Sequence, residues 1–197
     1  MVGAKLNDKL IRSKVLHHLV KNSHLKDTVV IEELDLCLGE ARIDLAVING
    51  IAKGIEIKSD RDSLDRLSYQ IPVYNRIFDV MEIVTGESHQ EAVLDIIPAW
   101  WGVSTVYSNR LSKLCYKQLR KPKINKDKDP LSVIQLLWKQ EALQLLETKN
   151  LSSRFKNKSR DEIWNYIINV FESDVLCKFV NQCLKARQNW RFVHQPE

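Results

Sequence analysis

The chain has 197 residues, of which 44% are hydrophobic and 28% are charged, which suffices for a buried core in a water-soluble protein. Its net charge of +5 permits attraction to nucleic acid but does not establish it. No apolar run approaches the roughly 20 residues of a membrane span, and residues 1–14 lack the apolar stretch of a secretory signal. We therefore expect no membrane contact and a cytoplasmic location.

The N-terminal part of the chain predicts one helix followed by three strands. Asn7 is a suitable helix N-cap, and Leu6 and Ile11 are spaced as a hydrophobic staple around it. Strands are expected over residues 28–34, 41–48 and 51–59. In the second strand, period-two alternation predicts that three apolar residues share one face: Ile43, Leu45 and Val47.

A second helix is predicted over residues 63–78, and two short strands follow at 80–84 and 103–107. Strands flanked by helices indicate an α/β fold with a mixed central β-sheet. Three helices are expected beyond it. One begins at Asp129-Pro130 and continues through Trp138 to Leu145, one is opened by a capping box at Ser159 and Glu162, and the last covers 174–187.

Composition changes near residue 109. Residues 110–129 hold eight Lys or Arg and two Asp, which predicts a mobile basic connector that is either solvated or follows a phosphate backbone. We therefore divide the chain into a core (1–108), this connector (109–129), and a C-terminal helical region that packs on the core (130–197). The apolar stripe around Trp138 either closes the core or docks a partner protein or a second copy in a homodimer.

The chemistry is concentrated in two strands. Asp44 interrupts an apolar strand, and Glu56-Ile57-Lys58 follows on the next one. Two carboxylates from neighbouring strands supply the oxygen ligands that Mg²⁺ prefers, and such an ion polarises a phosphoryl oxygen and acidifies a bound water. Lys58, one strand period after Glu56, shares its face and can stabilise developing negative charge. By itself an E-x-K strand is more often a solvated face with a salt bridge.

The ordered pattern RIDLAV, IEIKS and Gln70-x-x-x-Tyr74 resembles the PD-(D/E)XK nuclease superfamily, and within it a group of small, largely uncharacterised bacterial and phage members. Residues 5–107 carry the resemblance. It implies a restriction-endonuclease-like core with C-terminal helices. It also implies Asp44, Glu56 and the backbone carbonyl of Ile57 as ligands of Mg²⁺ or Mn²⁺, with Lys58 as the catalytic lysine of a nuclease acting on DNA. The alternative is a nucleic-acid-binding or partner-binding module with this fold and little or no catalysis.

One departure from that superfamily concerns its further acid on the first helix. Here Asp8, near the helix start, is the acid available, and Glu33 at the end of the first strand is an alternative. The sequence does not decide which of them fills the position. It therefore also leaves open whether the site uses two metal ions.

The turn between the two strands decides whether the site can form. A two-residue loop at Asn49-Gly50 would oppose Asp44 to Ile55 and turn Glu56 to the other face. A metal site therefore requires an offset of one residue. We predict either a three-residue loop with Gly50 left-handed or a bulge near Gly54.

Other residues have two interpretations each. Gln70 and Tyr74 share one side of a helix and either contact nucleic acid or support Lys58, unless Tyr74 packs in the core. Arg61 and Arg66 either form a solvated face or meet phosphates. Trp100 and Trp101 either stack on bases or, as we expect for at least one, pack against the sheet. The four cysteines and five histidines show no metal-ligand spacing.

Overall fold

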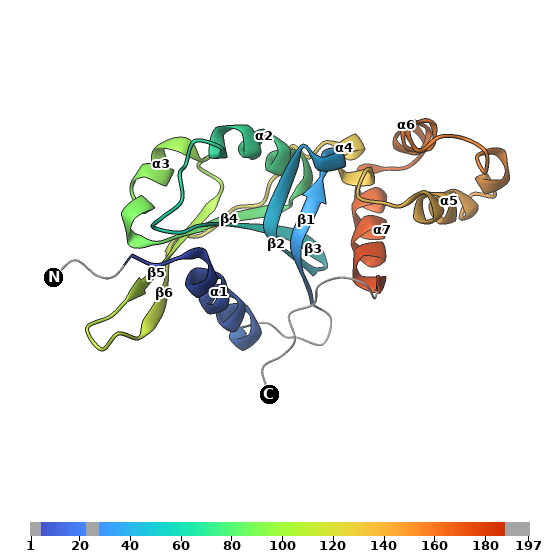
Figure 1. Cartoon of the computed structure of the whole chain (residues 1–197). Coiled ribbons are helices and arrows are strands. Elements are labelled where there is room, and N and C mark those ends of the chain that lie inside the picture. Colours follow the sequence, from blue (N-terminus) through green and yellow to red (C-terminus); the bar gives the residue numbers. More distant parts are fainter. Residues whose placement is uncertain (1–4, 23–27, 188–197) are drawn as a thin grey trace.

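The computed structural model describes residues 5–22 and 28–187 (Figure 1). Its centre is a six-stranded sheet in the order β1-β2-β3-β4-β5-β6. β1, β2 and β3 are antiparallel neighbours, β3, β4 and β5 run parallel, and β6 returns antiparallel to β5. The strands are β1 Val29–Leu36, β2 Ala41–Asn49, β3 Ile51–Lys58, β4 Val80–Thr85, β5 Gly102–Ser108 and β6 Leu114–Arg120.

Helices cover both faces of this sheet (Figure 1). α1 packs on one face and contributes Ile11 and Val15 to an apolar cluster with Leu45 and Ile55. The larger cluster lies on the other face and includes residues of α2, α4, α6 and α7. The helices are α1 Asp8–Asn22, α2 Leu67–Ile77, α3 Ala92–Ile96, α4 Pro130–Ile134, α5 Lys139–Glu147, α6 Arg160–Val170 and α7 Ser173–Ala186. The predicted α/β fold with a mixed central sheet and C-terminal helices is confirmed.

Local signals placed several helix ends correctly. The Asn7 side chain accepts from Leu10 N–H at 3.0 Å, as an N-cap does. Asp129 caps α4 by accepting from the N–H groups of Leu131 and Ser132. None of the helices within residues 5–22 and 28–187 is long and apolar enough to cross a membrane.

The β2–β3 hairpin has the register that a shared site requires. Ile48 pairs with Ala52, and Gly50 lies between the strands with φ 72°. The connection is therefore the predicted three-residue loop with a left-handed glycine, and no bulge at Gly54 is needed. The ladder ends at Leu45–Ile55, so Asp44 comes level with Glu56.

The β1–β2 pair contains an irregularity that the sequence pattern does not predict. The ladder skips Glu33 and Asp44, and Glu33 is left-handed with φ 54°. Consequently Ile43 packs in the α2-side cluster, while Leu45 packs in the α1-side cluster. The expectation that Ile43, Leu45 and Val47 share one face is wrong, because the alternation shifts at Asp44.

The basic segment is also different from a mobile connector. Residues 114–120 form β6, an edge strand of the sheet. Beyond it, the N–H groups of Lys123, Asn125 and Asp129 donate to the carbonyls of Trp100, Asp79 and Arg76, each at 2.8 Å. The backbone of this segment is thus bound along the core, and the core does not end at residue 108.

The helix expected from Pro130 to Leu145 is interrupted. α4 ends at Ile134, and α5 begins after Trp138, which is its N-cap and is 56% exposed. Trp138 therefore does not close the core, whereas Ala142 and Leu145 do. α7 returns to the sheet, where Asn181 donates to the Gly50 carbonyl at 3.3 Å. The C-terminal helices thus pack on the core, with α5 and α6 extending away from the sheet (Figure 1).

Candidate active site

A cavity of about 800 Å³ opens where β2 and β3 part. It brings together Asp44 from β2 and Glu56, Ile57 and Lys58 from β3, as the sequence predicts. Its lining is acidic, with Asp8, Glu33, Asp35, Glu40, Asp44, Glu56 and Asp62 against the basic residues Arg42, Lys58 and Arg66. Such a cavity attracts cations, and a phosphate group enters it favourably only together with one.

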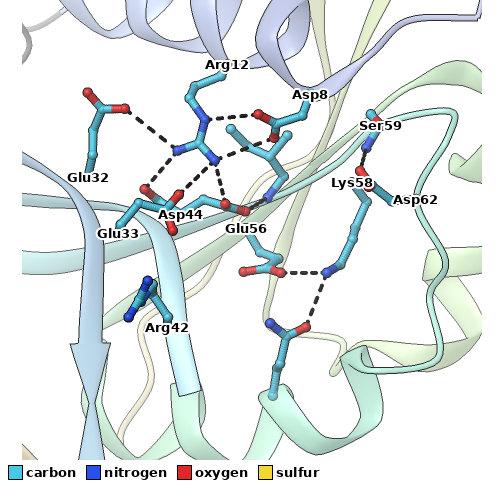
Figure 2. A network of polar contacts seen from close by, with 12 residues as sticks. Asp8, Arg12, Glu32, Glu33, Arg42, Asp44, Glu56, Lys58, Ser59 and Asp62 are labelled. Carbon is cyan, nitrogen blue, oxygen red and sulfur yellow. Dashed lines mark hydrogen bonds and ion pairs between the residues drawn. The ribbon is translucent and has the colours of Figure 1, made fainter. Parts of the chain in front are cut away.

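Glu56 and Lys58 form a buried ion pair at the end of β3 (Figure 2). Lys58 Nζ lies 2.7 Å from Glu56 Oε1, and the residues are 5% and 2% exposed, respectively. Burial of both groups strengthens their attraction relative to a surface pair. Lys58 is therefore held in one position at the wall of the cavity.

Gln70 and Tyr74 of α2 connect this pair to the core. Gln70 Oε1 accepts from Lys58 Nζ at 3.2 Å, and Gln70 Nε2 donates to the Tyr74 hydroxyl at 2.9 Å. The same hydroxyl lies 2.8 Å from Glu56 Oε2 and 2.9 Å from the Arg42 carbonyl, to one of which it donates. Tyr74 is fully buried, so it both packs in the core and supports the pair. Burial and the nearby Glu56 raise the pKa of Tyr74, which therefore keeps its proton.

Glu56 carries an unfavourable negative charge. Burial, followed by the proximity of Asp44, raises the pKa of Glu56 to about 7, although Lys58 and Tyr74 oppose the shift. Two neighbouring carboxylates with a raised pKa are a place where a bound cation would be stabilising.

This raised pKa predicts a pH-dependent difference in stability between the native chain and Glu56→Gln. The pKa of Glu56 is about 7 in the folded chain and 4.5 in the unfolded reference. The stabilisation of the folded chain by protonated Glu56 is therefore fully present below pH 4.5 and is lost as the pH rises to about 7. The free energy of unfolding of Glu56→Gln minus that of the native chain should therefore grow between pH 5 and 8, by on the order of 3 kcal/mol. Urea unfolding at several pH values with chelator measures it. Parallel stability curves would contradict the assignment.

Asp44 is held from two sides. Its Oδ2 accepts from the Ile57 N–H and its Oδ1 from Arg12 Nη2, both at 2.7 Å (Figure 2). Burial raises the pKa of Asp44, while the Ile57 N–H and Arg12 oppose that shift. The Ile57 N–H thus bonds to a side chain just beyond the end of the β2–β3 ladder.

Arg12 is a site residue that the sequence interpretation missed. It lies on α1, four residues after Asp8, and this spacing on a helix face was the available signal. Both candidates for the further acid contact it, with Arg12 nitrogens 3.2 Å from Asp8 and 3.0 Å from Glu33. The structure therefore brings Asp8, Glu33 and Asp44 to one guanidinium.

The remaining predicted residues divide between the cavity and the core. Arg66 lines the cavity, and Arg61 is exposed and not part of its lining. Trp101 is fully buried and donates from Nε1 to Asn75 at 2.8 Å, so it packs against the sheet and cannot stack on bases. Trp100 is half-buried against the same core.

The atoms available to coordinate a metal ion in this cavity are mainly carboxylate oxygens. In the described part of the chain, no three His, Cys, Asp or Glu side chains are grouped so that they can hold a metal ion. Asp44 and Glu56 therefore need a backbone oxygen and water molecules to complete a coordination shell. Mg²⁺ and Mn²⁺ accept oxygen ligands, and Mg²⁺ retains several waters in its protein sites. The oxygens of Asp44 and Glu56 are donors of the kind that such an ion accepts.

Comparison with known proteins gives a family. The family model described as Bacteriophage P4 protein cII matches residues 1–195. The chain belongs to the bacteriophage P4 protein cII family. Protein cII of Enterobacteria phage P4 is 25% identical over 182 residues, which are 92% of this chain and 68% of that protein. Membership of the cII family does not test the resemblance to PD-(D/E)XK nucleases, which stays a prediction.

One solved structure is weakly similar. It is the SPO1766 protein of unknown function from Silicibacter pomeroyi, which is 19% identical, with a TM-score of 0.45. The match covers 71% of this chain and 89% of that one. At this sequence identity and TM-score, nothing about the site is inferred from that structure.

Proposed function

We propose that this chain is a metal-dependent nuclease of the PD-(D/E)XK type, with a restriction-endonuclease-like core, that hydrolyses phosphodiester bonds of DNA. The observation that carries the proposal is the convergence of Asp44, Glu56 and Lys58 in one cavity. That convergence depends on the three-residue loop at Gly50, because a two-residue loop would place Glu56 on the other face.

The proposal gives each residue a role. Asp44, Glu56 and the Ile57 carbonyl would hold Mg²⁺ or Mn²⁺. A bound ion of this kind polarises a phosphoryl oxygen and lowers the pKa of water. The raised pKa of Glu56 supports the assignment, since a cation beside Glu56 and Asp44 would offset their mutual repulsion.

Lys58 would orient the attacking water and stabilise the negative charge that develops on the phosphate. Its ammonium is fixed by Glu56 and Gln70, so it needs little reorganisation when that charge appears. Gln70 and Tyr74 act as positioning residues, because they hold the Lys58–Glu56 pair. Arg66, which lines the cavity, would meet a neighbouring phosphate.

The test is cleavage by the purified chain of linear duplex, supercoiled and single-stranded DNA, and of RNA, with Mg²⁺ or Mn²⁺. We expect cleavage of DNA that stops on addition of chelator, since the carboxylates alone provide no Lewis acid. Asp44→Asn should weaken Mn²⁺ binding and cleavage together. Absence of cleavage of every nucleic acid with either ion would contradict the nuclease proposal.

A nucleic-acid-binding or partner-binding module without catalysis is the second candidate. It is favoured by the engagement of Asp8 and Glu33 with Arg12, since these acids are then not free for a metal. The exposed Trp138, with the Arg187 guanidinium 4.2 Å from its ring centroid, favours docking of a partner or second copy at the C-terminal helices. Salt-dependent DNA binding without turnover would separate this module from a nuclease.

A further inference from the structure

The Arg12 guanidinium lies among four carboxylates that come from α1, β1 and β2 (Figure 2). The shortest distances from its nitrogens are 2.7 Å to Asp44, 3.0 Å to Glu33, 3.2 Å to Asp8 and 3.8 Å to Glu32. Its Nη1 also donates to the Asp44 carbonyl at 3.2 Å. All three nitrogens of the guanidinium are therefore engaged inside this acidic cluster.

The charge of Arg12 is permanent. Burial disfavours the charged form, but Asp44 and Asp8 outweigh burial and raise the pKa of Arg12 above its ordinary value. A guanidinium does not deprotonate in proteins. The acidic cluster thus contains the positive charge of the Arg12 guanidinium.

Arg12 is also fixed in space. Its neighbour Ile11 and the following Val15 are buried between α1 and the sheet, and the Arg12 side chain is 17% exposed. Asp8, four residues earlier, holds the guanidinium from the same helix face. Packing of α1 on the sheet therefore places the Arg12 guanidinium beside Asp44 when no ligand is bound.

We propose that Arg12 is the resident second cation of this site. The chain then binds one divalent ion, through Asp44 and Glu56, and the guanidinium takes the place of a second ion between Asp8, Glu33 and Asp44. This inference rests on the proposed metal-dependent function and deepens it. It assigns Asp8 and Glu33 to Arg12 rather than to metal, and it makes the reaction a one-metal reaction.

The first experiment measures Mn²⁺ stoichiometry on the full chain at pH 8, from the electron paramagnetic resonance signal of free Mn²⁺. The native chain should bind one ion. With the guanidinium between them, Asp8, Glu33 and Asp44 are not grouped to hold a metal ion. Arg12→Met keeps an apolar stem and removes the charged group that separates these carboxylates, so they can close on an ion and the variant should bind two. Arg12→Lys should bind one, because it keeps a cation. Arg42→Met is the matched control: Arg42 lines the same cavity but pairs with Asp35, so the variant should also bind one ion.

A second experiment does not depend on the folding of Arg12→Met. The double variant Asp8→Asn, Glu33→Gln removes two acids of the cluster and keeps Arg12. If these acids bind only Arg12, the double variant should bind one Mn²⁺ with an affinity within about threefold of the native value. A loss of tenfold or more, about 1.4 kcal/mol, would show that they bind metal and would overturn the proposal.

The outcomes separate this inference from the proposed function. Two Mn²⁺ ions on the native chain, or one ion on both the native chain and a folded Arg12→Met, would overturn the role of Arg12 and leave a metal-dependent nuclease possible. No Mn²⁺ on the native chain would overturn both proposals. Thermal melting gives an independent readout: Mn²⁺ should raise the melting temperature of Arg12→Met more than that of the native chain.

Discussion

Replacing Lys58 by methionine is expected to lower Mn²⁺-dependent DNA cleavage by about 10²–10³-fold, the usual cost of removing one fixed group that stabilises transition-state charge. Lys58 is the buried ammonium at the cavity wall, 2.7 Å from Glu56, and methionine fills much of its volume without the charge. Mn²⁺ binding should persist, because both carboxylates remain. Single-turnover cleavage rates at saturating Mn²⁺ measure the effect.

Lys53 on the same strand provides a matched control. It lies on the other face of the sheet, where its Nζ is 2.5 Å from the buried Glu82. Lys53→Met therefore removes an equivalent lysine–glutamate pair away from the cavity. We expect it to cost stability and leave the cleavage rate of folded protein unchanged. Equal loss of cleavage in both variants would contradict a specific catalytic role for Lys58.

Trp101→Ala is expected to cost about 3–5 kcal/mol of unfolding free energy, as large-to-small changes at fully buried aromatic positions do. Trp101 is fully buried, its ring centroid is 6.1 Å from that of Tyr74, and it loses a hydrogen bond to Asn75 when truncated. Because Tyr74 supports Glu56, the variant should also loosen the site. Urea unfolding measures the loss.

Trp100→Ala is the comparison for Trp101→Ala, since Trp100 is adjacent but only half-buried. It should cost clearly less, because less apolar area is exposed to water on truncation. If instead Trp101→Ala left stability unchanged and selectively weakened DNA binding, the base-stacking interpretation would replace the packing interpretation.

The sequence by itself determined features that a few neighbouring residues encode. Asn7, Asp129 and Ser159 predicted helix starts because an N-cap is a contact between residues two or three positions apart. The alternation in β3 placed Glu56 and Lys58 on one face. Requiring one face for Asp44 and Glu56 predicted either a left-handed Gly50 in a three-residue loop or a bulge near Gly54, and the chain adopts the first.

The tertiary structure decided the features that depend on distant partners. β6 has no clear alternation of burial, and as an edge strand it is held by backbone bonds to β5. Ile43 and Leu45 pack on different faces at the point where Glu33 of β1 and Asp44 of β2 are both left out of the ladder. Arg12 meets Asp44 across 32 positions, and an ion pair between residues so far apart leaves no periodic signal in a single sequence. The acidic half of the candidate site was therefore readable from the sequence. For the cation inside it, the sequence offered only the four-residue spacing from Asp8 and nothing that pointed to Asp44.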